Sequence, residues 1–126
     1  MLENDKMILI YGLNEQESNA FKKIASEYNL PKHKIIKNDM GKMTIRDILD
    51  GLNLEVFNVD LPEEKIILFN NFTDEQLKYT INLIRETFDF SPILAVITPT
   101  SIEWTFENLL EHLIEEREWF KKQKNK

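Results

Sequence analysis

One ten-residue segment of this chain occurs twice, and this repetition constrains the fold more than any other feature. Met43-Thr-Ile-Arg-Asp-Ile-Leu-Asp-Gly-Leu52 and Trp104-Thr-Phe-Glu-Asn-Leu-Leu-Glu-His-Leu113 share three identical and five similar residues. Upstream of each segment lies a short apolar run, Ile8–Tyr11 or Ile66–Phe69, with the length and composition typical of a strand. The sequence therefore predicts two equivalent structural units that share a core.

The same helix-start signal follows each of these predicted strands. Asn14 is followed three residues later by Glu17, and Thr73 by Gln76, so that each pair can satisfy its own free backbone amides. Beyond each signal, the apolar residues fall on one helical stripe. The stripes consist of Ala20, Phe21, Ile24, Ala25 and Tyr28 in the first helix, and of Leu77, Ile81, Ile84 and Phe88 in the second.

Each half continues with a second strand and a second helix. We expect His33–Lys37 to be an edge strand, whereas Pro92–Thr98 is apolar enough for a strand that is covered on both faces. Hydroxyl residues could cap the closing helices: Thr44 in the first half, and either Ser101 or Thr105 in the second. The order β-α-β-α is thus predicted twice.

These elements predict an α/β fold, a tandem pseudo-repeat of two βαβα units sharing one mainly parallel four-stranded sheet with helical cover. A strand, helix and strand at this spacing form a crossover between parallel strands. We expect a single domain over residues 1–126, with the internal repeat at 7–52 and 65–118. The connector 53–64 is too apolar for a free linker, so it should pack against the domain and could add a short strand. Residues 119–126 form a basic C-terminal tail.

Composition excludes several other classes of protein. The chain of 126 residues is 42% hydrophobic, has a net charge of −6 and contains no cysteine. It can therefore build a packed core, it is not a disulfide scaffold, and no apolar run is long enough for a membrane span. Residues 1–6 lack the basic region and the apolar stretch of a secretory signal. We therefore expect a cytoplasmic protein.

Several motifs of the second half match a known family. After the strand at Ile66–Phe69 come Thr73-Asp-Glu-Gln76, Ala95-Val-Ile-Thr-Pro-Thr100, Trp104-Thr105, Leu109-Leu110 and Leu113-Ile-Glu-Glu116. On these motifs, residues 65–118 resemble the bacterial domain-of-unknown-function family 3783. Ser101 departs from the pattern of this family, in which an asparagine is expected. The resemblance implies a bacterial, intracellular protein, and it brings no known activity.

Polar side chains gather after the two predicted strands of the second half. Because parallel strands end at one edge of a sheet, these side chains could together hold a small polar or anionic ligand. The candidate ligand-binding residues are Asn70, Asn71, Thr73, Thr98, Thr100, Ser101 and Trp104. Helix capping, turn formation and packing explain the same residue types without a ligand. The three glycines form neither a dinucleotide-binding motif nor a P-loop.

No catalytic or metal-binding constellation stands out. His112 precedes Glu115 and Glu116 at the i+3 and i+4 positions, but a transition-metal site normally has further histidine or cysteine ligands. His33 lies between two lysines, and no serine occupies a Gly-x-Ser-x-Gly turn. We therefore expect no catalytic residue, no metal and no cofactor, and the balance is against an enzyme.

The last predicted helix has the most suggestive surface. Its buried stripe is expected to consist of Phe106, Leu109, Leu110, Leu113, Ile114 and Phe120. Trp119 falls instead on the neighbouring charged face, where it could pack on the connector or anchor a protein partner or a second copy. Trp119 and Phe120 are therefore the candidate interface. The lysines that follow complement the carbonyl end of the helix.

The leading hypothesis is a non-enzymatic protein-interaction or self-association module. The alternative is a small-molecule or anion-binding sensor at the C-terminal edge of the second-half strands. The negative net charge and the lack of a second basic, aromatic-containing patch argue against a nucleic-acid partner. We expect no membrane partner either.

Overall fold

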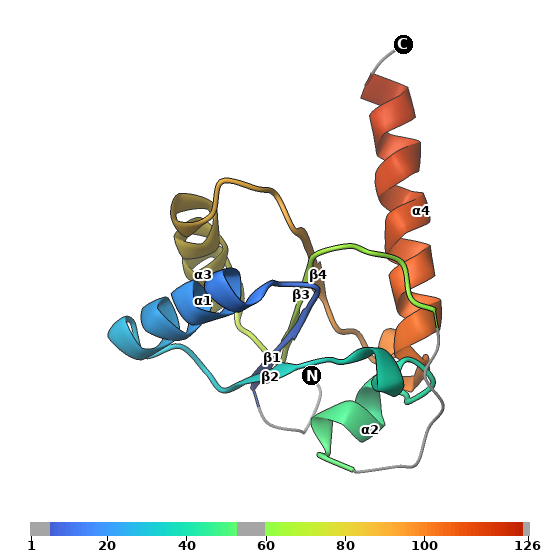
Figure 1. Cartoon of the computed structure of the whole chain (residues 1–126), viewed down its shortest axis with the longest axis horizontal. Helices are drawn as coiled ribbons and strands as arrows, with labels where there is room; N and C mark the ends of the chain where they lie inside the picture. Colours follow the sequence, from blue (N-terminus) through green and yellow to red (C-terminus); the bar gives the residue numbers. More distant parts are fainter. Residues whose placement is uncertain (1–5, 53–59, 125–126) are drawn as a thin grey trace. The chain divides into compact units, whose positions relative to one another are not determined.

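The structure of this protein is a computed structural model that describes residues 6–52 and 60–124, and it has a mixed α/β fold with one four-stranded sheet (Figure 1). The elements in chain order are β1 (Met7–Tyr11), α1 (Glu15–Glu27), β2 (His33–Ile35), η1 (Asn38–Met40), α2 (Ile45–Leu49), β3 (Ile66–Asn70), α3 (Asp74–Thr87), β4 (Ile93–Val96), η2 (Ser101–Glu103) and α4 (Phe106–Lys124), where η1 and η2 are 3-10 helices.

These elements form two compact units, each of which takes one segment from either half of the chain. The sheet unit comprises Met1–Ile36 and Glu63–Pro99, and it contains all four strands with α1 and α3. The helical unit comprises Lys37–Pro62 and Thr100–Lys126, and it contains the remaining helices.

The strand order in the sheet unit is β2-β1-β3-β4. The two outer pairs, β1 with β2 and β3 with β4, are parallel, as expected for strands that are joined through a helix. The central pair, β1 with β3, is antiparallel, and Leu9 lies opposite Leu68 at its middle. The two halves of the chain therefore meet in the sheet through one antiparallel pair of strands. β1 starts one residue earlier and β3 ends one residue later than the apolar runs predict.

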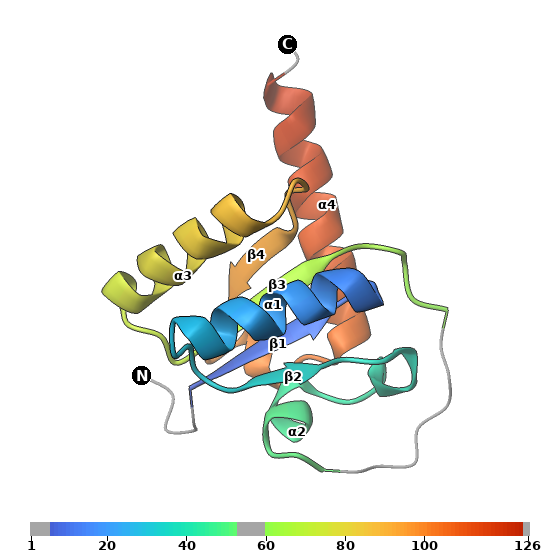
Figure 2. The same ribbon diagram turned by 60° about the vertical axis from the view of Figure 1, so that its left-hand side comes forward.

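One face of the sheet is covered by α1 and α3, which lie on the same side of it (Figure 2). Successive side chains of a strand point to opposite faces, so alternate residues of β1 and β3 meet the two helices. The core between them consists of Ile8, Ile10, Phe21, Ile24, Ile67, Phe69, Leu83 and Ile84. Tyr28, the last residue of the predicted α1 stripe, is 44% exposed because the helix ends there.

The two outer strands differ in how well the sequence predicts them. β2 is an edge strand, as expected from its lysines. β4 is an edge strand too, and Val96 is 47% exposed, so the expectation of a strand covered on both faces is wrong. An apolar composition does not tell a central strand from an edge strand, because that difference depends on the order of strands in the sheet.

The expected capping boxes begin both helices of the sheet unit. The Glu17 N–H donates to Asn14 Oδ1 at 2.8 Å, and the Asn14 N–H donates to Glu17 Oε1 at 2.9 Å. The Gln76 N–H likewise donates to Thr73 Oγ1 at 3.2 Å, and the Thr73 N–H donates to Gln76 Oε1 at 3.1 Å. These short-range contacts fix the start of each helix.

A turn with positive φ leads from each central strand to these caps. Gly12 has a φ of +87°, and Asn71, at the matching place after β3, has a φ of +62°. A Cβ atom on Gly12 would lie 1.8 Å from the carbonyl oxygen of Glu64, so this turn needs glycine for space as well as for conformation. Asparagine tolerates this conformation better than most other residues.

Threonines cap both α-helices of the helical unit. The Asp47 N–H donates to Thr44 Oγ1 at 3.1 Å before α2, and the Asn108 N–H donates to Thr105 Oγ1 at 3.2 Å before α4. Of the two caps expected for the last helix, Thr105 is therefore the actual one, whereas Ser101 begins the short helix η2.

Two expectations concern the rest of the chain. The predicted packing of the connector concerns mainly residues 53–59, which lie outside the described residues, and Leu61 beyond them is half-buried. Within residues 6–52 and 60–124, no helix combines the length and the apolar character that a membrane crossing needs.

Candidate functional site

Four of the candidate ligand-binding residues lie in the sheet unit. Because β3 and β4 are parallel, Asn70, at the end of β3, and Thr98, just beyond β4, leave the sheet at the same edge. The Ile97 N–H donates to the Phe69 carbonyl oxygen at 2.9 Å and holds the two strand ends together. Asn70 is buried, and Thr98 is exposed. The parallel alignment is present, and ligand binding at this edge stays a prediction.

Local structure accounts for the other two of these four residues. The hydroxyl of Thr73 caps α3 and accepts the Gln76 N–H. Asn71 holds the positive φ of the turn after β3. Capping and turn formation therefore explain Thr73 and Asn71 without a ligand.

The remaining three candidates lie in the helical unit. Ser101, the first residue of η2, is 8% exposed, and Thr100 before it is exposed. Trp104 follows η2, and its ring stands edge-on to the ring of His112, with 5.3 Å between the centroids. The seven candidate residues are thus divided between the two units, four in one and three in the other.

A cleft of about 410 Å³ opens in the sheet unit, away from the predicted edge. Its walls are the first turns of α1, from Asn14 to Ala20, and residues 87–90 at the end of α3. The rings of Phe88 and Phe90 lie 5.0 Å apart in the second wall. The sequence reasoning missed this cleft because its walls are far apart in the chain, although the capping box at Asn14 marks one of them.

An ion pair at this cleft ties the start of α1 to the residue that precedes β3. Lys65 Nζ donates to Glu17 Oε2 at 2.5 Å and lies 4.1 Å from the centroid of the Phe90 ring. The hydrogen bond from Lys65 and that from the Asn14 backbone hold the pKa of Glu17 below its usual range. Glu17 is therefore an anion engaged by two partners, not a group available to a ligand.

Most other polar groups of the cleft are engaged as well. The Asn14 side chain caps α1, and the Thr87 hydroxyl donates to the Leu83 carbonyl oxygen at 2.7 Å. Among the described lining residues, only Gln16 and Asp89 have polar side chains without such a partner. The cleft thus offers a ligand two aromatic rings and few polar contacts.

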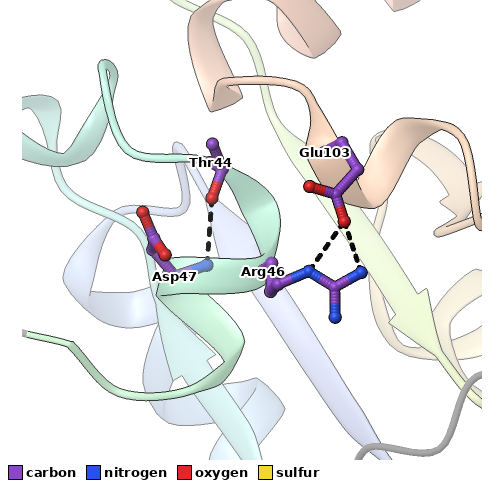
Figure 3. Close-up of polar contacts among 4 residues, drawn as sticks. All are labelled: Thr44, Arg46, Asp47 and Glu103. Carbon is purple, nitrogen blue, oxygen red and sulfur yellow. Dashed lines mark hydrogen bonds and ion pairs between the residues drawn. The ribbon is translucent and has the colours of Figure 1, made fainter.

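Two ion pairs in the helical unit join the repeated segments. Lys42 Nζ lies 2.6 Å from Glu107 Oε1, and the guanidinium of Arg46 donates through Nε and Nη2 to Glu103 Oε1 (Figure 3). Figure 3 also shows Thr44 beside the latter pair, where it caps α2. Arg46 and Glu107 hold the same position in the two repeated segments but carry opposite charges, and each takes part in one of these ion pairs.

The last turns of α4 expose both residues of the candidate interface. Trp119 is 56% exposed and Phe120 is 55% exposed, and their rings stand edge-on with 5.1 Å between the centroids. The sequence places Trp119 outside the buried stripe, in agreement with its exposure, but the assignment of Phe120 to that stripe is wrong. Leu109 and Leu110 on this stripe are buried, whereas the stripe continues beyond the residues that cover it. Helical periodicity identifies a face but not where its cover ends.

Charged residues flank the two exposed aromatic rings. Glu115, Trp119 and Lys122 are all exposed and follow one another at helical spacings of four and three residues, so they share one face. We call Glu115, Trp119, Phe120 and Lys122 the α4 tail patch. One turn apart on the same helix, His112 Nε2 lies 3.5 Å from Glu116 Oε2. In the described part of the chain, no group of three or more histidine, cysteine, aspartate or glutamate side chains is arranged to hold a metal ion.

Comparison with known proteins supports the resemblance of the second half. Residues 65–120 match the family model described as "Domain of unknown function (DUF3783)". The match begins just before β3 and ends at Phe120, so it includes both residues of the candidate interface. Neither the curated proteins nor the solved structures yielded a match.

Proposed function

We propose that this protein is a non-enzymatic protein-interaction module and that the α4 tail patch is its contact surface. The observation that carries this proposal is the pair of neighbouring aromatic side chains, Trp119 and Phe120, each more than half exposed on a helix. Tryptophan is among the residues that most often dominate the free energy of protein–protein binding. An exposed aromatic pair rimmed by charges is typical of such a contact.

The length of α4 supports this assignment. The repeated segments end at Leu52 and Leu113, and the corresponding helix of the first half, α2, stops at Leu49. α4 instead continues to Lys124. Within the described residues of the first half, which run to Leu52, no helix corresponds to the part of α4 beyond Leu113, and this part carries the exposed aromatic residues.

The proposal includes a tandem repeat as the scaffold of this surface. In support, both halves contain the same succession of elements, and the middle residues of the central strands, Leu9 and Leu68, lie opposite each other. Two of the three strand pairs are parallel. On this view, the first half completes the sheet, and the second half alone supplies the binding helix.

A site-specific photo-crosslink tests the proposed function. Benzoylphenylalanine in place of Phe120, in the full chain and in the source cells, should form a covalent adduct with a protein. The control is the same substitution at Tyr79, a residue of α3 that is 52% exposed. We expect an adduct at position 120 and none at position 79. If position 120 gives no protein adduct in cells or with the purified protein, the proposed function is wrong.

The shared edge of β3 and β4 favours a second candidate function, the binding of a small polar or anionic ligand. Asn70 and Thr98 leave this edge side by side, because the strands that precede them are parallel neighbours. A panel of anions and metabolites should then raise the thermal unfolding temperature of the wild-type chain and not that of Thr98→Val. A panel that shifts neither protein, or both equally, would rule out this edge as the ligand site.

A further inference from the structure

We infer that the partner of the α4 tail patch is a second copy of this chain, bound so that the two α4 helices run antiparallel. This inference rests on the proposed function and adds the identity and the orientation of the partner. It is carried by the order of charges along the exposed face of the helix.

The exposed face of α4 carries an acidic group, an aromatic ring and a basic group in that order. Glu115 lies one turn before Trp119, and Lys122 lies one turn after it, all three on one face. On the adjoining face, Phe120 lies between Glu116 and Gln123 with the same spacing. The face that carries Trp119 is therefore negative at one end and positive at the other, with Trp119 at its centre.

A two-fold axis near Trp119 turns this order into complementarity. In an antiparallel pair of helices, Glu115 of one copy faces Lys122 of the other, and the same contact recurs on the opposite side of the axis. A parallel pair would instead place Glu115 opposite Glu115 and Lys122 opposite Lys122. The repulsion of like charges thus disfavours the parallel pair, and the attraction of opposite charges favours the antiparallel one.

The two charges that this contact needs are not used within the chain. The neighbouring charges on α4 do form ion pairs within the chain, since Glu118 pairs with Arg117 at 3.0 Å and with Lys121 at 3.9 Å. Across residues 6–52 and 60–124, neither Glu115 nor Lys122 forms an ion pair. Both are exposed, so a second copy can reach them without breaking an existing contact.

Sedimentation equilibrium of the purified full chain tests the identity of the partner. We expect a dimer that Trp119→Ala weakens by at least about tenfold, as is typical of a central tryptophan in an interface. Glu115→Lys and Lys122→Glu should each weaken the dimer by roughly three- to thirtyfold, because each change creates two like-charge pairs. The double variant restores opposite charges on both sides of the axis and should regain most of the affinity.

Glu86→Lys is the matched charge control, since Glu86 is exposed on α3 and is not part of the α4 tail patch. This variant should leave the dimer unchanged. Thermal unfolding and circular dichroism of each variant show whether the fold is intact. A wild-type chain that stays monomeric at the highest soluble concentration would overturn the inference. So would a double variant that dimerises no better than the single variants.

Disulfide trapping tests the orientation, because the chain has no cysteine of its own. In the antiparallel pair, position 115 of one copy faces position 122 of the other. Oxidation of a mixture of Glu115→Cys and Lys122→Cys should therefore give more linked dimer than either variant alone, and the mixed dimer keeps one Glu115–Lys122 contact on the other side of the axis. The reverse result would show a parallel pair and contradict the inference. A photo-crosslink at Phe120 to a different protein, with a monomeric purified chain, would leave the proposed function standing and refute self-association alone.

Discussion

Thr44 and Thr105, which hold the same position in the two repeated segments, face each other across an antiparallel bridge. The residues that follow them complete the relationship. The Ile45 N–H donates to the Trp104 carbonyl oxygen, and the Phe106 N–H donates to the Met43 carbonyl oxygen, both at 2.9 Å. Exchanging the two halves converts one of these hydrogen bonds into the other. The backbone at this junction is thus locally two-fold symmetric.

The charges beside this bridge distinguish the two halves. Lys42 and Glu103 hold equivalent positions in the two halves, and so do Arg46 and Glu107. The ion pairs join Lys42 to Glu107 and Arg46 to Glu103, so the same contact occurs twice with opposite polarity. The first half provides both cations, and the second half provides both anions. Two first halves would bring cations together, and two second halves would bring anions together. Charge therefore favours contact between a first half and a second half.

A charge-reversal cycle at Lys42 and Glu107 measures this preference. Lys42→Glu and Glu107→Lys should each lower the free energy of unfolding, and the double variant should recover most of the loss. The Glu107 side chain is 26% exposed and that of Lys42 is 53% exposed, so we expect a coupling free energy of only about 0.2–1 kcal/mol. Urea unfolding of the four proteins gives this coupling. A coupling free energy near zero at low salt would show that the Lys42–Glu107 ion pair does not favour contact between the two halves.

Removal of the cap hydroxyl of α4 should destabilise the protein. Thr105→Ala leaves the Asn108 N–H without its acceptor and should lower the free energy of unfolding by about 0.5–2 kcal/mol. Thr105→Ser keeps the acceptor and should recover most of the loss. The control is Thr100→Ala, because the exposed Thr100 side chain does not cap η2, and its loss should stay within about 0.5 kcal/mol. Equal losses for Thr105→Ala and Thr100→Ala would contradict the assigned cap.

Substitution should destabilise the protein at one of the two turns with positive φ and have little effect at the other. Gly12→Ala forces a Cβ atom to within 1.8 Å of the Glu64 carbonyl oxygen and should destabilise the protein by more than about 2 kcal/mol. Asn71→Gly removes a side chain from a conformation that glycine adopts freely, and its effect should stay within about 1 kcal/mol. Thermal unfolding of both variants checks this, and a tolerated Gly12→Ala would show that the turn after β1 can rearrange.

The stability of the fold should fall as His33 is protonated. Burial of its ring beside Phe21, with Lys22 nearby, holds the pKa of His33 below its usual value of 6.5. The unfolded chain therefore binds this proton more readily, and the free energy of unfolding decreases as the pH falls from about 6.5 through the folded-state pKa. His33→Leu should abolish this decrease, because leucine has no proton to bind. Leucine should fit at this position, since Leu94 occupies the matching place in β4. Denaturant unfolding between pH 5 and pH 8, about one and a half pH units on either side of 6.5, measures it.

Glu17 provides an internal reference for this experiment. Its pKa is lowered from 4.5, so its contribution to stability is fully present above that pH and is lost as the pH falls through its folded-state pKa. Glu17→Gln should therefore change the pH dependence only in the more acidic range. An unchanged slope around pH 6.5 in His33→Leu would contradict the assignment of the higher window to His33.

The sequence predicts those parts of the candidate interface that depend on neighbours in the chain. Helical periodicity places Trp119 outside the buried stripe, and it is exposed. The same periodicity wrongly buries Phe120, because the stripe extends past the residues that cover it. The ion pair of Lys42 with Glu107 carries no sequence signal at all, since its partners lie on segments far apart in the chain.

The sequence by itself determined the order of strands and helices, the two capping boxes and the threonine before α2. These features arise from hydrogen bonds and apolar spacing within a few residues, and such contacts form in the same way wherever the segment lies. Only the tertiary structure decided that β1 and β3 pair antiparallel, that β4 lies at an edge and that Phe120 on α4 is exposed. Each of these depends on which distant segment a surface meets, and the alternatives share the same local hydrogen bonds and differ only in long-range packing.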